Sequence, residues 1–270
     1  MRAGAGQYAL REMLQRKIGG TGMKLQGQVA LVTGGSRGIG RATALAFAAE
    51  GADIAFTHYN DDARAAETAS EIAALGRRAM QRPVDAADIA ATRAYVAEVA
   101  RDFGPIDILF NNAGINIRHN FEDFTEAEFD RIMDVHVKGM FFTAQAVYPA
   151  MVARGRGVII NVASQLAIKG APLAVPYCSA KAAIIGFTRA LAWEATAKGV
   201  RVNAIAPGPI DTDLVRQNSQ EWQDAFKARL PIGRFGRPEE IAATALLLAG
   251  PDGGFYAGAL LSPNGGDVMY

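Results

Sequence analysis

Short runs of apolar and β-branched residues alternate along the chain with longer stretches of helical periodicity. The runs predict buried strands, and the stretches between them predict helices of about ten residues or more. We expect strands at residues 28–34, 52–58, 79–82, 106–112, 157–164, 200–207 and 259–263. We expect helices at residues 41–50, 61–75, 89–103, 125–153, 177–198 and 238–249.

This alternation predicts an α/β protein. Strand–helix–strand units are right-handed and place parallel strands in one sheet with helices on both faces. We therefore expect a single doubly wound, Rossmann-type domain over residues 24–270, with a mostly parallel sheet of seven strands. The polar stretch 209–236 interrupts the alternation, and a segment of that length in a compact domain is commonly a lid over the substrate.

Residues 1–23 stand apart from the pattern of the domain. Residues 8–18 could form a short amphipathic helix, ended by Gly19 and Gly20. We interpret the segment either as a dispensable extension, including a misassigned start, or as an arm that contacts another subunit. It lacks the continuous apolar core of a signal peptide, so a cytoplasmic protein is predicted.

The composition argues against several classes of function. Lys and Arg number 28 and Asp and Glu 27, and a net charge of +1 does not favour nucleic acid or an acidic membrane as partner. The single cysteine, Cys178, excludes an internal disulfide framework, and the three histidines lack zinc-binding spacing, so no metal is predicted. No apolar run reaches the roughly 18 to 20 residues of a transmembrane helix. A small molecule is the expected partner.

A glycine-rich loop, TGGSRGIG at residues 33–40, follows the first predicted strand and precedes the first helix. Glycines let the backbone turn sharply and approach a pyrophosphate, and the free N–H groups of the helix start bind phosphates. The spacing is G-x3-G-x-G rather than the commoner G-x-G-x-x-G. In this position the loop predicts a dinucleotide site.

The end of the second predicted strand bears on the choice of cofactor. NAD-selective proteins of this type carry an acidic residue there, whereas residues 57–60 read Thr-His-Tyr-Asn, with His58 as a candidate contact. Arg37, inside the glycine loop, can pair with a 2′-phosphate through its planar guanidinium. The missing acid and the available arginine favour NADP(H), with NAD(H) as the alternative.

Ser164, Tyr177 and Lys181 are the candidate catalytic residues. Ser164 ends the fifth predicted strand, and Tyr177 and Lys181 are four residues apart on one face of the next helix. A free tyrosine has a pKa near 10, too high for easy proton exchange at neutral pH. A lysine cation and an oxidised nicotinamide nearby would lower that pKa, as general acid–base chemistry requires.

Together these segments resemble the short-chain dehydrogenase/reductase family. The matching motifs are TGGSRGIG (33–40), NNAG (111–114), Ser164 with Tyr177 thirteen residues later, YCSAK (177–181) and NAIAPGPIDTD (203–213). They occur in the order that the family has, and the resemblance covers residues 24–270. It implies a reversible NAD(P)(H)-dependent oxidoreductase that moves a hydride between a carbonyl and a secondary alcohol.

The resemblance also implies roles for single residues. Tyr177 would give or take the proton of the substrate oxygen, Ser164 would orient that oxygen, and Lys181 would hold the nicotinamide ribose. The other cofactor contacts would be Gly34, Ser36, Arg37, Gly38, Ile39, Gly40, His58, Asp85, Asn112, Ala113, Gly114, Pro207, Gly208, Ile210 and Thr212.

One position departs from the family pattern. The family places an asparagine in the helix at 125–153, where it bends the helix and holds a water in a proton relay to the lysine, and this chain has His136 there. Histidine can also bind water and pass protons, so His136 joins the predicted catalytic set. The alternative is a buried histidine with a structural role only.

The segments expected to contact substrate are rich in polar residues. Residues 115–121, 165–172 and 209–236 contain Asn116, Arg118, His119, Gln165, Lys169, Asp211, Arg216 and Gln217. They favour a small polar carbonyl compound or polyol. A 3-oxoacyl-carrier-protein reductase is an alternative, although Trp193 stands where such enzymes often carry an arginine that meets the acidic carrier.

Two other functions remain open. A non-catalytic dinucleotide sensor could share the fold, but it need not keep Ser164, Tyr177 and Lys181 together. An epimerase or dehydratase of the extended family is the other, although that group tends to be longer and to use a different glycine pattern. The resemblance further implies a homo-oligomer, a dimer or tetramer, formed through the helices at 125–153 and 177–198 and the C-terminal strand.

Overall fold

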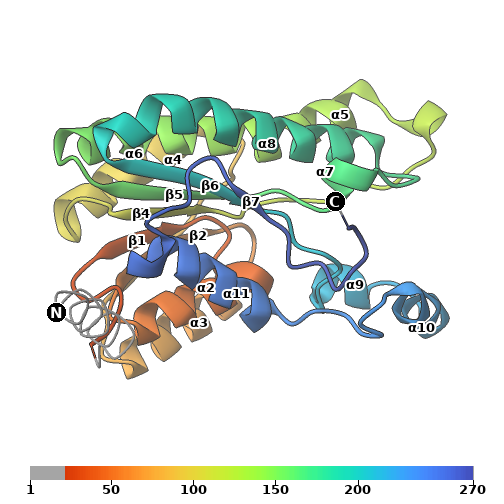
Figure 1. Ribbon diagram of the computed structural model, residues 1–270, viewed down its shortest axis with the longest axis horizontal. Coiled ribbons are helices and arrows are strands. Elements are labelled where there is room, and N and C mark those ends of the chain that lie inside the picture. Colours follow the sequence, from red (N-terminus) through yellow and green to blue (C-terminus); the bar gives the residue numbers. More distant parts are fainter. Residues whose placement is uncertain (1–21, 270) are drawn as a thin grey trace, which may run out of the picture.

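Seven parallel strands form the sheet of the computed structural model, which describes residues 22–269 (Figure 1). The expected helix at residues 8–18 lies outside the described residues. The strands are β1 (Val29–Val32), β2 (Asp53–His58), β3 (Ala79–Pro83), β4 (Ile108–Asn111), β5 (Gly157–Val162), β6 (Val200–Ile205) and β7 (Leu260–Leu261). Their spatial order is β3-β2-β1-β4-β5-β6-β7, which confirms the predicted doubly wound α/β fold.

Helices cover both faces of this sheet. The α-helices are α2 (Gly38–Ala49), α3 (Asp62–Ala74), α4 (Ile89–Asp102), α5 (Glu126–Met133), α6 (Gly139–Ala153), α7 (Leu166–Lys169), α8 (Val175–Ala195), α9 (Asp213–Arg216), α10 (Gln220–Arg229) and α11 (Pro238–Ala249). In Figure 1, α2, α3 and α11 lie below the sheet, and α4, α6 and α8 lie above it.

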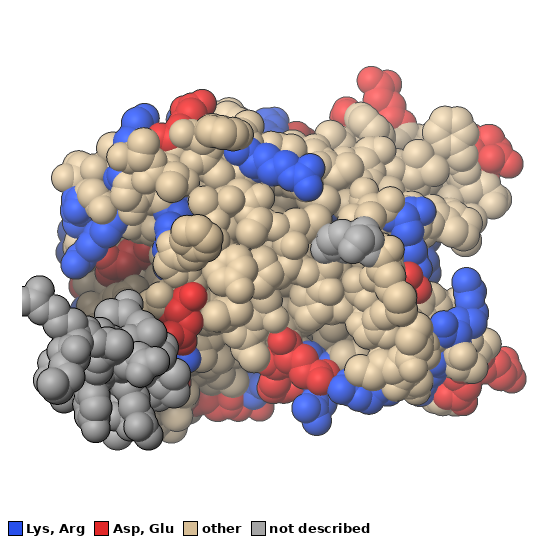
Figure 2. All heavy atoms as spheres, viewed as in Figure 1, with Lys and Arg blue, Asp and Glu red and all other residues tan. Residues whose placement is uncertain are grey.

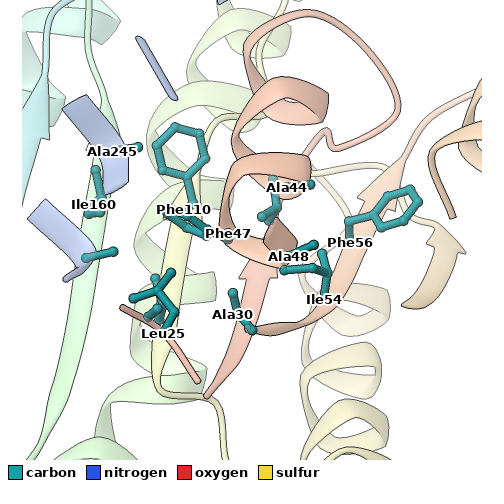
Figure 3. Close-up of a cluster of buried hydrophobic side chains, with 14 of the residues drawn as sticks. Leu25, Ala30, Ala44, Phe47, Ala48, Ile54, Phe56, Phe110, Ile160 and Ala245 are labelled. Carbon is teal, nitrogen blue, oxygen red and sulfur yellow. The ribbon is translucent and has the colours of Figure 1, made fainter. Parts of the chain in front are cut away.

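The strands divide their side chains between two cores, as the two-residue period of a strand requires. In β5, Ile160 packs into the core that α2 and α11 cover, and its neighbour Ile159 packs into the core that α4, α6 and α8 cover. Figure 3 shows the first core, where the rings of Phe47 and Phe110 meet edge to face at 6.3 Å. Burial on both faces explains why the strands read as continuous apolar runs.

The stretch predicted as one helix at 125–153 is two helices joined by a π turn, η2 (Asp134–Lys138). A capping box fixes the start of α5: the Thr125 hydroxyl accepts from the Glu128 N–H, and the Glu128 carboxylate accepts from the Thr125 N–H. The π turn adds a residue to the helical path and places His136 inside the molecule, where the residue is 2 % exposed.

The predicted lid segment 209–236 contains two helices that its polar composition did not reveal. These are α9 and α10, the second capped by the Ser219 hydroxyl, which accepts from the Trp222 N–H. Both helices stand at the end of the sheet where the strands finish (Figure 1). An isolated parallel β-bridge between Ile210 and Gly236 joins the two ends of the segment.

The strand order sets where a ligand can bind. The chain leaves β1 toward β2 on one side, and β4 lies on the other side of β1. Connections that diverge in this way open a crevice at the carboxyl ends of the strands, which is where doubly wound sheets bind ligands. The glycine loop follows β1 and the NNAG motif follows β4, so both reach this crevice.

Charged side chains of both signs lie mainly around the margin of the face in Figure 2, with a largely uncharged centre. This face therefore has no continuous basic stripe of the kind that tracks a nucleic-acid backbone. Within residues 22–269, no helix combines the length and the apolar character that a membrane crossing needs.

Candidate active site

The glycine loop has the shape of a phosphate cradle. Gly34 has φ +69°, which favours glycine, and a Cβ on Gly40 would lie 2.0 Å from the Gly34 carbonyl oxygen. The helix that follows, α2, begins with no side-chain cap and no acidic residue in its first turn. Its first N–H groups and the positive end of its dipole are therefore open to an anion, which fits the pyrophosphate of a dinucleotide.

Asn112 and Thr33 hold this loop in place. The Asn112 amide donates to the carbonyls of Thr33 and Gly34, each at 3.1 Å, and the Thr33 hydroxyl accepts from the N–H groups of Asn112 and Ala113. The Asn112 side chain thus joins the ends of β1 and β4 and shapes the loop. Sequence reasoning assigned Asn112 to the cofactor itself and did not notice Thr33, although Thr33 stands directly before the first glycine.

Arg37 lies in the glycine loop, and its side chain is 57 % exposed and close to two aspartates and a second arginine. Its Nε is 3.8 Å from an Asp61 oxygen, and its Nη1 is 3.7 Å from an Asp213 oxygen. Arg64, at the start of α3, also pairs with both aspartates. Sequence reasoning selected Arg37 and missed the other three residues of this group.

The residues beyond β2 and β3 are engaged in ways that the sequence did not predict. His58 is 1 % exposed, and its ring meets the Gln81 amide oxygen at 2.5 Å, so its side chain is not presented to a cofactor. The Asp85 carboxylate accepts from the Ala87 N–H and from Arg131 at 2.9 to 3.0 Å. Arg131 also lies over the Tyr59 ring, 5.7 Å from its centroid.

The segment that starts at Pro207 lies over the glycine loop. A Cβ on Gly38 would stand 3.3 Å from the Thr212 methyl group, so the structure brings these two predicted contacts together. Gly208 packs on the backbone of Asn264, and Ile210 is buried. The sequence-predicted pieces from residues 33–40, 112–114 and 207–212 therefore surround one crevice.

The three catalytic candidates converge at the carboxyl end of β5. Ser164 follows this strand and is 7 % exposed, and its hydroxyl is within hydrogen-bonding reach of the Tyr177 phenol. Lys181 is 4 % exposed, donates to the Val162 carbonyl at 2.7 Å, and holds its Nζ 5.6 Å from the centroid of the Tyr177 ring. The i, i+4 spacing on α8 thus places the phenol and the ammonium side by side, as predicted.

The pKa of Tyr177 differs from the expectation. Desolvation raises the pKa of this phenol, and only a smaller opposing effect comes from the hydrogen bond with Ser164. Burial also lowers the pKa of Lys181 to about 7, so its ammonium is only partly charged at neutral pH.

His136 lies directly behind Tyr177. The two rings meet edge to face, 5.3 Å between centroids and 89° between planes. The His136 Nε2 is 2.7 Å from the Ile115 carbonyl oxygen and 3.1 Å from its N–H nitrogen. Burial, together with the charge of Lys181, lowers the pKa of His136 to about 3, so the ring is neutral.

A small cavity borders His136. It measures about 10 Å³ and is lined by Thr33, Ala86, Asn111, Ala113, Val135, His136, Gly139, Met140, Thr143, Val162 and Ile184. The buried His136 Nδ1 and Asn111 Oδ1 have no hydrogen-bond partner among the residues that the structure describes. A polar cavity of this size suits a single water molecule.

Several of the polar residues predicted to face substrate are bound to other side chains. Gln165 and Lys169 both contact the Asp267 carboxylate of the C-terminal segment, and Asp211 pairs with Arg216. Arg118 is exposed and forms no ion pair within residues 22–269. Burial raises the pKa of Tyr177 and of Cys178, and the charge of Arg118 opposes that rise only slightly. Across residues 22–269, no group of three or more His, Cys, Asp or Glu side chains could hold a metal ion.

Comparison with known proteins identifies a family to which this chain is similar. A family profile described as short chain dehydrogenase matches residues 28–223. Galactitol 2-dehydrogenase of Agrobacterium fabrum is 39% identical over 259 residues, which cover 92% of this chain and 100% of that protein. Acetoacetyl-CoA reductase of Rhizobium meliloti is 39% identical over 246 residues, which cover 90% of this chain and 99% of that protein.

A solved structure agrees with this chain in fold and in sequence. A short chain dehydrogenase from Burkholderia cenocepacia, crystallised in complex with NADP, superposes with a TM-score of 0.84 at 38% identity. The match covers 90% of this chain and 98% of that one. Such agreement in fold and sequence extends over nearly all of the domain predicted at residues 24–270.

Proposed function

Because the chain belongs to the short-chain dehydrogenase family and is therefore a nicotinamide-dependent oxidoreductase, we propose that it works with NADP(H) on a small polar substrate. In this proposal it interconverts a carbonyl and a secondary alcohol, and NAD(H) is the weaker cofactor. The observation that carries the proposal is the convergence of Ser164, Tyr177 and Lys181 beside the glycine loop. Arg37, exposed in that loop, and the NADP bound to the Burkholderia relative support the choice of cofactor.

The glycine loop and the segment around Thr212 would hold the cofactor. When bound, it supplies the hydride acceptor or donor. The α2 N-terminus offers N–H groups to the pyrophosphate, and Arg37 offers its guanidinium to a 2′-phosphate. Lys181, buried at the base of the crevice, would donate to the nicotinamide ribose.

Tyr177 handles the proton in this mechanism. Its phenol donates a proton to the carbonyl oxygen during reduction and becomes a phenolate, and in oxidation that phenolate takes the proton from the alcohol. Ser164 donates a hydrogen bond that fixes the same oxygen. Because desolvation raises the pKa of Tyr177 in the protein alone, the phenol starts in its protonated form, ready for reduction.

We assign His136 as a positioning residue. Its ring packs edge to face against the Tyr177 ring and hydrogen-bonds the main chain of Ile115, the residue after the NNAG motif. The adjacent cavity has room for one water that could meet His136 Nδ1 and Asn111 Oδ1. Histidine would in this way take over the place of the family's asparagine.

The substrate class rests on the residues that surround Tyr177. The exposed cation Arg118 and the polar side chain of Asn116 favour hydroxylated or anionic small molecules. The two named relatives, one a polyol dehydrogenase and the other a coenzyme A thioester reductase, are equally similar, so identity does not choose between their substrates. We further propose a cytoplasmic homo-oligomer, a dimer or tetramer.

The test is a panel of polyols, sugars, keto acids and 3-oxoacyl thioesters, assayed with NADP(H) and NAD(H). Turnover is followed by the absorbance of the reduced nicotinamide. We expect turnover on a polyol or small keto compound with higher kcat/KM for NADP(H). Cofactor binding without turnover on any compound would instead support a non-catalytic sensor.

A further inference from the structure

Two arginines and two aspartates form a compact cluster beside the glycine loop. Arg37 belongs to the loop, Asp61 and Arg64 lie at the start of α3, and Asp213 is the first residue of the lid helix α9. The Asp213 Oδ2 accepts a hydrogen bond from Arg64 and is 3.7 Å from the Arg37 Nη1. One carboxylate oxygen therefore faces both guanidinium groups.

The two aspartates of this cluster are held differently. The Asp61 side chain is only 13 % exposed, and its Oδ2 accepts from the Ser36 hydroxyl at 2.7 Å, so it is a fixed part of the loop. The Asp213 side chain is 42 % exposed and its ion-pair partners are these two arginines. Because exposed ion pairs contribute little free energy, Asp213 is the anion of the pair that can be exchanged.

The position between the arginines suits a phosphate. Two guanidinium groups can each give a pair of parallel N–H donors to a phosphate monoester, whose charge at neutral pH is about −2. Both arginine side chains are about half exposed, at 57 % and 48 %, so an incoming group can reach them. Thr212, next to Asp213, touches the glycine loop at Gly38, so the lid and the loop already meet here.

We propose that Arg64 and Arg37 together bind the adenosine 2′-phosphate of NADP(H), and that the Asp213 carboxylate competes for the same two arginines. This inference rests on the proposed function, because it assumes the nucleotide lies along the glycine loop. NADP(H) displaces Asp213 and frees α9 from α3, whereas NAD(H), which has no 2′-phosphate, leaves the ion pair closed. Arg64 and Asp213 are then residues that determine cofactor selectivity.

The experiment measures cofactor affinity rather than turnover. NADPH and NADH are titrated into the full-length chain and followed by nicotinamide fluorescence, with calorimetry for NADP⁺ and NAD⁺. Arg64→Gln is expected to raise the Kd for NADPH about tenfold, as loss of a charge-assisted hydrogen bond does, and to change the Kd for NADH less than about twofold. Asp213→Asn is expected to lower the Kd for NADPH about threefold and to leave that for NADH unchanged.

Asp211→Asn is the matched control. Asp211 lies two residues earlier in the same lid and its side chain pairs with Arg216 rather than with the cluster. The substitution removes the same charge from the same segment, and we expect no change in the affinity for either cofactor. In the double variant of Arg64→Gln with Asp213→Asn, the gain from Asp213→Asn should shrink, because one of its two arginines is gone.

Each result decides a separate point. Weaker NADPH binding by Asp213→Asn would overturn the competition, because Asp213 would then be holding the arginines in place for the phosphate. Equal loss of NADPH and NADH affinity in Arg64→Gln would overturn its role as a phosphate ligand. A parent protein that binds neither cofactor would contradict the proposed function itself. If the parent prefers NADPH but Asp213→Asn and Asp211→Asn have the same Kd for NADPH, only the competition is overturned.

Discussion

The two ends of the crevice use charge in opposite ways. Around Tyr177 the groups are desolvated: Lys181 and His136 are at most 4 % exposed, and burial is the largest cause of each pKa shift there. Around Arg37 the groups are half exposed and paired with one another. Burial fixes protonation states and positions, whereas exposed ion pairs can exchange partners, so proton chemistry belongs at one end and cofactor selection at the other.

The largest effect is expected at the buried end. Tyr177→Phe removes the oxygen proposed to transfer the proton and should lower kcat by about 10³-fold, within the range of general acid–base catalysis. The NADPH affinity should stay within about twofold, because the cluster at Arg37 is untouched. Initial rates and a fluorescence titration of the same preparation test both points, and a parallel loss of affinity would show that the two ends are not separable.

His136 offers a finer test of the same region. His136→Ala removes the contacts to Ile115 and Tyr177 and should lower kcat about tenfold, equivalent to about 1.4 kcal/mol, with the cofactor Kd unchanged. His136→Asn should recover most of the loss, because an amide can also bond the Ile115 main chain. If turnover of the alanine variant equals that of the parent, His136 has no part in the reaction.

The buried histidine also predicts a pH dependence of stability. The pKa of His136 is lowered to about 3 in the folded protein, so between pH 6.5 and 3 only the unfolded chain takes up its proton. Stability then falls as the pH drops, by up to about 1.4 kcal/mol per pH unit from this group. Urea unfolding at pH 7 and pH 5 should show a smaller fall for His136→Asn than for the parent.

A second histidine serves as the control for that measurement. His119 is exposed and paired with Glu128, so His119→Asn removes an exposed histidine and leaves the buried His136 in place. We expect it to keep the fall seen in the parent. The interpretation fails if both variants lose the same amount between the two pH values.

The smallest effect is expected from salt. Raising the ionic strength from about 0.05 to 0.5 M should weaken NADPH binding severalfold, because half-exposed arginines are screened, whereas kcat at saturation should change less than about twofold. Steady-state kinetics at both ionic strengths give both quantities. A kcat that follows the affinity would place the catalytic end within reach of the solvent ions.

Local patterns were enough to predict most of the fold. The seven strands and the helix at 238–249 depend on neighbours within a few residues, and the structure has each of them. The helix α10 was not predicted, because its apolar stripe is short, with Trp222 and Phe226 one turn apart among polar and charged residues. The π turn was not predicted either, since one added residue barely disturbs a helical pattern.

The site was predictable where the chemistry depends on spacing and not where it depends on distant partners. Tyr177 and Lys181 are one turn apart, so a shared face follows from the sequence. Arg64 and Asp213 are 149 residues apart and meet only in the fold, and each alone looks like a solvated charge. The contacts that Gln81 and Thr33 make with the side chains of His58 and Asn112 were not predicted for the same reason, and the cofactor roles of His58 and Asn112 stay predictions.

The π turn at Asp134–Lys138 has a consequence for changes in chain length. A π turn is in effect an α-helix with one residue inserted, so deleting one residue there would restore regular winding. The deletion would leave α5 and α6 nearly in phase, but it would close the widened turn that carries His136 beside Tyr177. The widened turn at His136 is thus lost through a one-residue deletion, whereas most substitutions in α5 or α6 would keep it.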